Sequence, residues 1–273
     1  MPQPFLEPIV FGVLNVTPDS FSDGGRYLDR DAAIGHGQAL VRAGADVVDV
    51  GGESTRPGAE PVDPAEELAR VLPVVEALVA DGIRVSIDTR RASVAASAVS
   101  AGAAIVNDVD GGRDPGLLRV AAESGADLVL MHSRGPAERD GGYDDPVRDI
   151  AADLRIRVDA AVAAGVAPER LVIDPGIGFS KAAEENWRLL AHLDELRIDG
   201  LRMLVGVSRK RFLGELVDGT AEDRDGVTAV LSALLAERGV WALRVHEPAS
   251  TRAALAVVRR LREAACAPAI ASC

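Results

Sequence analysis

The chain alternates short, wholly apolar runs with longer stretches in which apolar residues recur at helical spacing. Runs that are apolar throughout are typical of strands buried on both faces of a parallel sheet. Eight such runs can be counted, over 9–16, 47–52, 85–88, 105–109, 128–132, 171–175, 203–208 and 242–246. Helical stretches follow the strands, the first three over 31–43, 64–80 and 91–101 and the last over about 249–264. Eight strand-helix units favour an α/β fold, a single (β/α)8 TIM barrel, over an open doubly wound sheet.

A barrel of this kind commonly takes roughly 250 residues in one domain, so we expect residues 1–273 to form a single domain. The tail after about residue 265 is made of small residues, and we expect it to be loosely ordered. Two segments that follow strands, 17–30 and 53–63, are long and rich in glycine and polar residues. The loops after the strands form the catalytic face of a barrel, so these segments are expected to border a site.

The net charge is −12. Nucleic acid and anionic membrane attract a basic surface, so neither is expected as a partner. The N-terminus does not read as a signal peptide, and no apolar run approaches the roughly 18 residues of a membrane span. We therefore expect a cytoplasmic protein. The only cysteines, Cys266 and Cys273, lie in the C-terminal tail, which argues against a disulfide framework or a cysteine metal site.

Polar side chains end the otherwise apolar strands. Helix caps and turns explain any one of them, most readily Asp49 and Asp108. Caps and turns do not explain ten polar residues at the same end of one barrel, because each buried polar group without a partner costs about 1 to 3 kcal/mol. We expect them to line a site, and they are Asn15, Asp49, Asp88, Asn107, Asp108, His132, Asp174, Ser208, Arg244 and His246.

The chemistry of these residues divides into two regions. Asp88, Asn107 and Asp174 end the third, fourth and sixth strands, and carboxylates with an amide suit a flat heterocycle with an amino-pyrimidine edge. Basic side chains follow the last two strands, in SRKR at 208–211 and RVH at 244–246, where barrels often bind phosphate. Arg56, after the second strand, is expected to complete this anion site.

Lysine and aromatic residues are both scarce. Lys181 and Lys210 are the only lysines among 30 basic residues. Lys210 falls in the cationic run, whereas Lys181 taken alone is expected on a solvated face. Phe21, Phe179 and Phe212 all follow strands, where together they are placed to wall a flat ligand.

Seven motifs, in this order along the chain, resemble the dihydropteroate synthase family of pterin-binding enzymes. They are GVLNVTPDSFSDGG at 12–25, DVGGESTRPGA at 49–59, SIDT at 86–89, VNDV at 106–109, DPGIGF at 174–179, SRKRFLG at 208–214 and RVH at 244–246. The resemblance covers nearly the whole chain. It implies a transferase that joins 6-hydroxymethyl-7,8-dihydropterin pyrophosphate to p-aminobenzoate, giving 7,8-dihydropteroate and pyrophosphate in folate synthesis.

The resemblance also implies roles for individual residues. The pterin ring would be held by Asp88, Asn107, Asp174 and Lys210, with Phe179 beside it. The pyrophosphate would be bound by Arg56, Arg244 and His246, and Mg²⁺ would be ligated by Asn15. The p-aminobenzoate pocket would be formed by Thr55, Arg56, Pro57 and Arg211, with Phe21 also in the substrate-binding set. The residues with catalytic roles would be Asp23, Lys210, Arg244 and His246. The family further implies a homodimer built from the late helices.

Five positions depart from the usual family pattern. Ser180 and Ala182 replace the glycine and threonine often seen after GIGF. Arg211 stands where many members have serine, Asp110 where a serine is common, and Glu247 where an aspartate is common. None of these changes removes a proposed ligand-binding group. Asp110 adds a negative charge near the barrel mouth, and we expect it to be a solvent-facing turn residue.

Two other functions remain as alternatives. A pterin methyltransferase domain that serves a corrinoid protein would share the barrel and the acidic pterin residues, but methyl transfer does not require the two long loops with a basic anion site. A non-catalytic paralogue would keep the fold as a binding partner and would be expected to lose loop or anion-site residues. Here Asn15, Asp23, Arg56, Lys210, Arg244 and His246 are all present.

Overall fold

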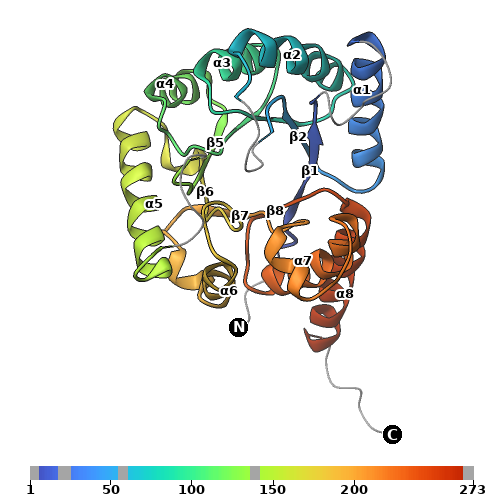
Figure 1. Cartoon of the computed structure of the whole chain (residues 1–273), viewed down its shortest axis with the longest axis vertical. Coiled ribbons are helices and arrows are strands. Elements are labelled where there is room, and N and C mark those ends of the chain that lie inside the picture. Colours follow the sequence, from blue (N-terminus) through green and yellow to red (C-terminus); the bar gives the residue numbers. More distant parts are fainter. Residues whose placement is uncertain (1–5, 18–25, 55–60, 136–141, 267–273) are drawn as a thin grey trace, which may run out of the picture.

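The computed structural model describes residues 6–17, 26–54, 61–135 and 142–266. Eight parallel strands form one closed barrel in sequence order, and the last strand pairs with the first. Figure 1 shows the helices as a ring around these strands. The strands are β1 (Ile9–Asn15), β2 (Val47–Gly51), β3 (Val85–Asp88), β4 (Ile105–Asp108), β5 (Asp127–Met131), β6 (Leu171–Asp174), β7 (Arg202–Val205) and β8 (Ala242–Val245). The predicted TIM barrel is confirmed.

The helices connect consecutive strands on the outside of the barrel. They are α1 (Arg26–Arg42), α2 (Pro64–Ala80), α3 (Ala92–Ser100), α4 (Pro115–Ser124), α5 (Pro146–Ala163), α6 (Ala183–Ala191), α7 (Asp225–Glu237) and α8 (Pro248–Cys266). Short 3-10 turns are η2 (Pro168–Arg170), η3 (Leu193–Leu196), η4 (Arg211–Glu215) and η5 (Glu222–Arg224).

Aspartate-proline pairs begin α2, α4 and α5, and in α2 and α4 the aspartate side chain caps the helix. The Asp63 carboxylate accepts from the N–H of Ala65 at 2.8 Å before α2, and Asp114 accepts from the N–H of Gly116 at 2.8 Å before α4. Each carboxylate satisfies a backbone donor that has no partner within its helix, and the following proline has no N–H to satisfy. This local signal explains why the predicted helix at 64–80 coincides with α2. The predicted helix at 91–101 lies close to α3, which has no side-chain cap at its N-cap residue, Arg91.

The first helix differs from its prediction. The pattern predicts a helix over 31–43, whereas α1 begins at Arg26, so the predicted loop over 17–30 is too long. The first six residues of α1, RYLDRD, are mostly polar and do not carry an apolar stripe. Periodicity therefore misses this helical start. The final helix, predicted over about 249–264, extends to Pro248 and Cys266.

Two layers of side chains fill the barrel. Inward-pointing residues recur every second position along a strand. The lower layer is apolar and comprises Phe11, Val47, Ile105, Val129, Val172, Leu204 and Ala242. Two residues further along four of these strands stand Asp49, Asn107, Asp174 and Arg244. A polar layer therefore lies on an apolar one at the carboxyl ends of the strands, where TIM barrels form their sites.

No helix in the described ranges has the length and apolar character needed to cross a membrane. The tail beyond residue 266 lies outside the described residues. All eight strands belong to one sheet, while the organisation of the whole chain as one domain stays a prediction.

Candidate active site

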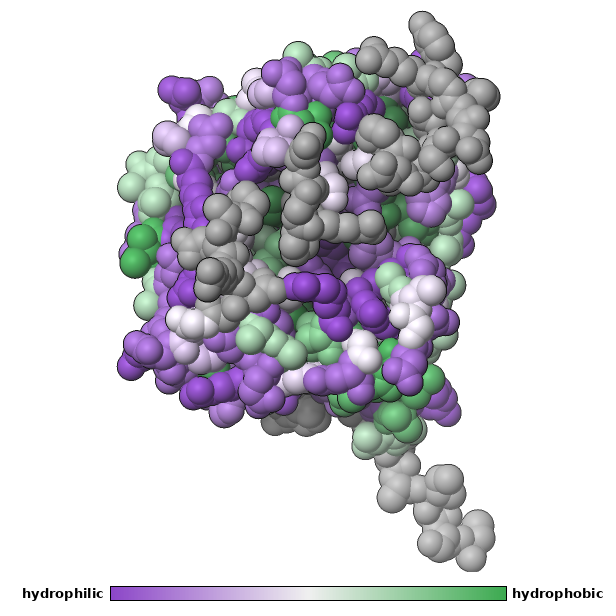
Figure 2. Space-filling view, in the orientation of Figure 1, coloured by the Kyte–Doolittle hydropathy of each residue, from purple (hydrophilic) through white to green (hydrophobic). Residues whose placement is uncertain are grey.

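Hydrophilic side chains gather at the centre of the face seen in Figure 2, inside the ring of helices. This is the mouth of the barrel, where six strand ends contribute polar groups: Asn15 from β1, Asp49 from β2, Asp88 from β3, Asn107 from β4, Asp174 from β6 and Arg244 from β8. The fold therefore brings together residues that are far apart in the sequence.

Arg244 connects the two regions that the sequence separates. Its Nε donates to Asp49 Oδ2 at 2.6 Å, and its Nη2 donates to Asp88 Oδ2 at 2.6 Å. Asp49 Oδ2 also accepts from Asn107 Nδ2 at 3.0 Å. The predicted anion-binding arginine and the predicted pterin carboxylate thus form one ion-paired cluster, with Asn107 attached to it.

Burial and charge act in opposite directions on this cluster. Burial raises the pKa of Asp88 to about 7, although the positive charge of Arg244 opposes the rise. Burial also lowers the pKa of Arg244, but the carboxylates of Asp49 and Asp88 more than offset this, so that its pKa lies above the ordinary value. Arg244 therefore stays charged, and the ionisation of Asp88 is sensitive near neutral pH.

A second group of residues follows β6 and β7. Asp174 ends β6, and its Oδ1 accepts from the N–H of Gly176 at 2.7 Å. The Lys210 Nζ lies 3.6 Å from the centroid of the Phe179 ring, a cation–π arrangement. Because the cation covers a flat aromatic face beside a carboxylate, this part of the mouth has the groups needed to hold a planar heterocycle.

The charges of Asp174 and Lys210 are also set by burial. Burial raises the pKa of Asp174 to about 6, against the lowering effects of the Gly176 N–H and of the Lys210 charge. Burial, together with the nearby charge of Arg244, lowers the pKa of Lys210 to about 7. Perturbed groups of opposite sign are typical of functional sites.

His246 and Arg211 stand on the loops after β8 and β7. The backbone N–H of His246 donates to Ser208 Oγ at 3.1 Å, and its Nδ1 lies 3.0 Å from the same oxygen. This hydroxyl joins the two loops in which barrels commonly bind phosphate. Arg211 begins η4 directly after Lys210, with an exposed side chain.

Asn15 is the last residue of β1, and its side chain is half-buried. The remaining predicted site residues, Phe21, Asp23, Thr55, Arg56 and Pro57, lie outside the described residues. Phe212, a third predicted aromatic, is buried and packs edge-on against Trp187 at 5.0 Å between ring centroids, which places it in the core rather than at a ligand face.

Glu53 connects the two sides of the loop after β2, at residues 53–54 and 61–62. Its Oε1 accepts from the N–H of Val62 at 2.9 Å, across the loop, and its two oxygens accept from the guanidinium groups of Arg90 and Arg91. Arg91 also bonds to the buried Glu67. These hydrogen bonds lower the pKa of Glu53 despite the opposing effect of burial, so a charged network fixes the base of this loop.

Two others of the ten polar residues at the strand ends, Asp108 and His132, make their contacts away from the Arg244 cluster. Asp108 accepts from the backbone N–H groups of Asp110 and Gly112 and so forms a turn, as predicted. His132 Nδ1 lies 3.1 Å from Lys181 Nζ. On the other side of the ring, His132 Nε2 lies 3.4 Å from Oδ2 of Asp153 in α5.

Several expectations from the sequence need correction. Asp49 is wholly buried and paired with Arg244, so it is part of the site rather than a turn former. Lys181 is only 4% exposed, so its expected place on a solvated face is wrong. Asp110 was expected to face solvent, but it is half-buried, with its carboxylate 3.8 Å from the guanidinium of Arg90. Arg90 also bonds to Glu53, so Asp110 borders that charged network. Glu247 caps α8 by accepting from the N–H groups of Ala249 and Ser250.

The signals for two of these residues were present in the sequence. Asp49 interrupts a buried apolar strand two residues after Val47, on the same face as the barrel core. Lys181 is one of two lysines in a chain that otherwise uses arginine. Their partners, in contrast, come from distant strands and required the structure.

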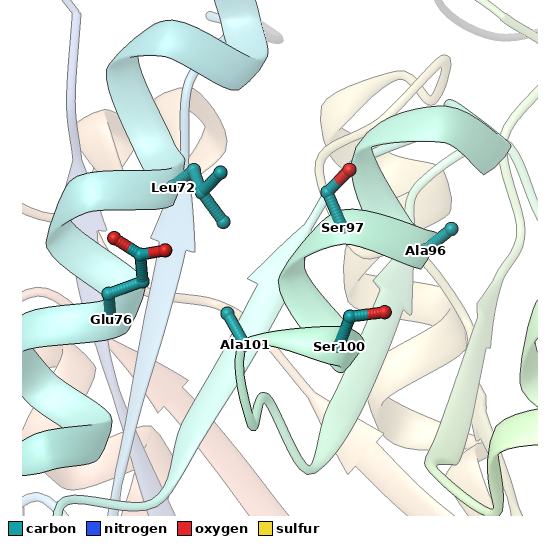
Figure 3. Close-up of a pocket in the computed structure, with 6 residues that line it drawn as sticks. All are labelled: Leu72, Glu76, Ala96, Ser97, Ser100 and Ala101. Carbon is teal, nitrogen blue, oxygen red and sulfur yellow. The ribbon is translucent and has the colours of Figure 1, made fainter.

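A groove of about 410 Å³ lies on the outside of the barrel between α2 and α3 (Figure 3). Its lining is Leu72, Glu76, Ala96, Ser97, Ser100 and Ala101. Glu76 is the one charged side chain in this lining, so the groove lacks the convergent acids, bases and cations found at the barrel mouth. The mouth is therefore the candidate active site.

Comparison with known proteins agrees with this geometry. The family model of pterin binding enzymes matches residues 11–246. The dihydropteroate synthase of Mycobacterium leprae is 55% identical over 265 residues, which span 93% of each chain. The dihydropteroate synthase of Xanthomonas albilineans with 4-aminobenzoic acid superposes with a TM-score of 0.89 at 45% identity, over 96% of this chain and 94% of the other.

A second structure of the Xanthomonas enzyme, in complex with 7,8-dihydropteroate, superposes with a TM-score of 0.86 at 42% identity, over 97% of this chain and 96% of the other. The chain belongs to the family of pterin-binding enzymes. Within that family it groups with the dihydropteroate synthases, which are transferases. The predicted family and the predicted type of activity are confirmed.

Proposed function

We propose that the barrel mouth binds 6-hydroxymethyl-7,8-dihydropterin pyrophosphate and p-aminobenzoate and joins them to give 7,8-dihydropteroate and pyrophosphate. The observation that carries this proposal is the position of Arg244 within 2.6 Å of both Asp49 and Asp88, on the strand beside the Ser208–His246 pair. One site thus presents acceptors for a pterin next to donors for a pyrophosphate.

The acceptors suit the polar edge of the pterin. Asp174 and Asp88 supply carboxylate oxygens, and Asn107 supplies an amide held in place by Asp49. An ionised carboxylate accepts two parallel N–H bonds from an amino-pyrimidine. Lys210 lies over Phe179, where its ammonium is placed to donate to a ring heteroatom while the phenyl ring borders the heterocycle.

The reaction replaces one bond at the pterin methylene carbon with another. The bond from that carbon to the pyrophosphate oxygen breaks, and both bonding electrons leave with the pyrophosphate. The amine nitrogen of p-aminobenzoate then forms the new carbon–nitrogen bond and releases one proton to solvent. Such a step needs charge stabilisation and alignment more than a strong general base, which agrees with the absence of a serine-histidine-aspartate arrangement among the assigned residues.

Arg244 and His246 are assigned to the pyrophosphate. A guanidinium carries five N–H groups, so bonds to two carboxylates still leave donors for phosphate oxygens. Positive charge here favours departure of the pyrophosphate, because the leaving group gains negative charge as the bond breaks. Arg56 is assigned to the pyrophosphate as well, and Asp23 is assigned to stabilising the electron-poor pterin. The p-aminobenzoate pocket is assigned to Thr55, Arg56, Pro57 and Arg211, with Phe21 also in the substrate-binding set.

Magnesium is assigned to Asn15. The amide oxygen of this residue is a hard donor at the end of β1, a type of ligand that Mg²⁺ accepts. Within the described ranges, His, Cys, Asp and Glu side chains do not group in threes as a metal centre. The fit is thus to an ion held mainly by pyrophosphate oxygens and water, as Mg²⁺ commonly is. When bound, Mg²⁺ would neutralise charge on the leaving group.

The proposed assembly is a homodimer through α7 and α8. These two helices pack together and leave large apolar side chains exposed, namely Val230, Leu234, Val257 and Leu261. Apolar residues gather over this part of the molecule in Figure 2. Contiguous exposed apolar surface favours a protein interface.

We also assign the enzyme to the cytoplasm, consistent with only two cysteines.

Turnover tests the proposal directly. Purified protein would be incubated with dihydropterin pyrophosphate, p-aminobenzoate and Mg²⁺, and both products measured, with Lys210→Ala and Arg244→Ala as variants. We expect equal amounts of dihydropteroate and pyrophosphate from the wild type and a loss of at least about 100-fold in each variant. Pterin binding without pyrophosphate release would instead support the non-catalytic paralogue.

A further inference from the structure

Both lysines of the chain contact the same turn, which follows β6 and has the sequence DPGIGFSK. Lys210 contacts it through the ring of Phe179, 3.6 Å from Nζ to the ring centroid. Lys181 contacts its backbone, with Nζ 2.9 Å from the carbonyl oxygen of Phe179. The function proposed above uses Lys210 and leaves the buried Lys181 without a role.

The ammonium of Lys181 is surrounded by acceptors. Besides Phe179, it donates to the carbonyl oxygen of Gly176 at 2.8 Å and to His132 Nδ1 at 3.1 Å. An ammonium has three N–H donors, and these three contacts use all of them. The His132 carbonyl oxygen lies slightly further away, at 3.4 Å. A compact ammonium satisfies such divergent acceptors better than a planar guanidinium does.

His132 is fixed as a neutral acceptor. Burial, together with the positive charges of Lys181 and Arg157, lowers its pKa to about 2. Its Nε2 faces Asp153 Oδ2 at 3.4 Å, so the network places the ring proton on Nε2 and leaves Nδ1 to accept from Lys181. Arg157 in turn donates to Asp153 at 2.6 Å and to the Ser133 carbonyl at 3.0 Å. Lys181 is thereby connected to α5.

The turn that Lys181 holds adopts an uncommon backbone. Gly176 and Gly178 have φ values of 64° and 80°, and Ser180 has a φ of 50° although it is not a glycine. A left-handed residue other than glycine costs about 1 to 2 kcal/mol. The carbonyl oxygens of Gly176 and Phe179 in this turn both accept from one cation, the ammonium of Lys181. The Lys181 side chain, which folds back onto the turn that it ends, stabilises this conformation through these hydrogen bonds.

Gly176 relays this contact to the site. Its carbonyl accepts from Lys181, while its N–H donates to Asp174 Oδ1 at 2.7 Å. We propose that Lys181 is a positioning residue of the pterin site, which holds the turn carrying Asp174 and Phe179 and provides a positive charge behind Asp174. The contacts of Lys181 lie within the protein and do not depend on the proposed function. The inference rests on that function only in assigning Asp174 to the pterin.

The charges around the turn support this role. Asp174 is faced by Lys181, Lys210 and Arg244, all of which favour its ionised form against the effect of burial. Lys181 has its own pKa lowered to about 7, first by burial and then by Lys210 and Arg157, while Asp174 and Glu185 oppose the lowering. Removing the charge of Lys181 should therefore make Asp174 easier to protonate.

Carbon-13 NMR of labelled aspartate carboxyl groups tests the inference without requiring turnover. The Asp174 signal would be assigned by its loss in Asp174→Asn, and its titration followed in the wild type and in Lys181→Gln. Gln keeps an N–H donor but removes the charge, so the fold is less disturbed than in Lys181→Met. We expect the Asp174 midpoint to move up by about one pH unit in Lys181→Gln.

Two controls separate charge from packing. Lys181→Arg keeps the charge but fits the turn carbonyls less well, so the Asp174 midpoint should move up by less than in Lys181→Gln. Asn186→Ala removes an uncharged contact to the same turn, the 2.6 Å bond from Gly178 N–H to Asn186 Oδ1, and should weaken pterin pyrophosphate binding without moving the midpoint. An unmoved midpoint in folded Lys181→Gln, or an equal shift in Asn186→Ala, would overturn the inference. Failure of wild-type turnover would instead count against the proposed function.

Discussion

The Nη2 atom of Arg244 and the Oδ2 atom of Asp88 lie 2.6 Å apart across the barrel mouth. Arg244 stands on β8 and Asp88 on β3, and these strands are separated in the sheet by β1 and β2. The contact therefore spans the interior of the barrel. It links the group assigned to the pyrophosphate with a group assigned to the pterin, so the two halves of the substrate would be bound by one connected set of charges.

The two bonds of Arg244 make lysine a poor replacement. Arg244→Lys keeps a positive charge, but one ammonium cannot reproduce the fixed geometry of Nε to Asp49 and Nη2 to Asp88. We expect kcat/KM for pterin pyrophosphate to fall by about 100-fold or more. Arg260→Lys is the matched control, because Arg260 is 75% exposed on α8, and it should leave kcat/KM within twofold. A similar small effect at Arg244 would contradict the role of the paired bonds.

Asp49 should contribute strongly to stability. Asp49→Ala leaves Arg244 and Asn107 without a shared acceptor in a buried place, and breaking a buried pair costs about 3 to 5 kcal/mol. We expect a loss of this size in the free energy of unfolding measured by urea denaturation. Asp194→Ala removes an exposed carboxylate that bonds to Arg197, and it should cost less than about 1 kcal/mol. Equal losses in the two variants would argue against a buried ionic cluster.

The pH dependence of kcat/KM reports ionisations of the free enzyme. As pH falls, Asp88 with a pKa of about 7 and then Asp174 with a pKa of about 6 take up protons and stop accepting from the pterin. As pH rises above about 7, Lys210 loses its charge. We expect activity to fall on both sides of neutral pH, with midpoints that belong to the coupled cluster.

Lys210→Arg identifies the alkaline limb of this profile. Arginine stays protonated throughout the range, so the decline above neutral pH should disappear, even if the maximum rate is lower. The acid limb should remain, because both carboxylates are unchanged. An alkaline limb that persists unchanged in Lys210→Arg would assign that ionisation to another group.

Gly176 should not tolerate a side chain. A methyl group there would overlap the carbonyl oxygen of His132, and the backbone has a φ of 64°. We expect Gly176→Ala to lower the free energy of unfolding by more than about 3 kcal/mol. Gly200 has a φ of 79° with no atom within 4 Å of an added methyl group, so Gly200→Ala isolates the backbone cost of about 1 to 2 kcal/mol. Equal destabilisation would show that the contact with His132 is unimportant.

The sequence was informative where local chemistry fixes structure. Apolar runs identified the strands, and polar residues at their ends identified Asp88, Asn107, Asp174 and Arg244 as neighbours at one mouth. It did not identify partners, because the pairing of Arg244 with Asp88 depends on how strands far apart in the sheet face each other. Lys181 shows the same limit, since a lone lysine in a polar segment reads as a surface residue until His132 is found against it.

We propose that one site binds the pterin through Asp174 and the pyrophosphate through the loops at Ser208 and His246. Calorimetric dissociation constants of 6-hydroxymethyl-7,8-dihydropterin and of its pyrophosphate would be compared for wild type, Asp174→Asn and His246→Ala. We expect Asp174→Asn to weaken both ligands by about tenfold or more, and His246→Ala to weaken only the pyrophosphate by a similar factor. Equal weakening of both ligands by His246→Ala, or unchanged pterin binding in Asp174→Asn, would contradict the claim.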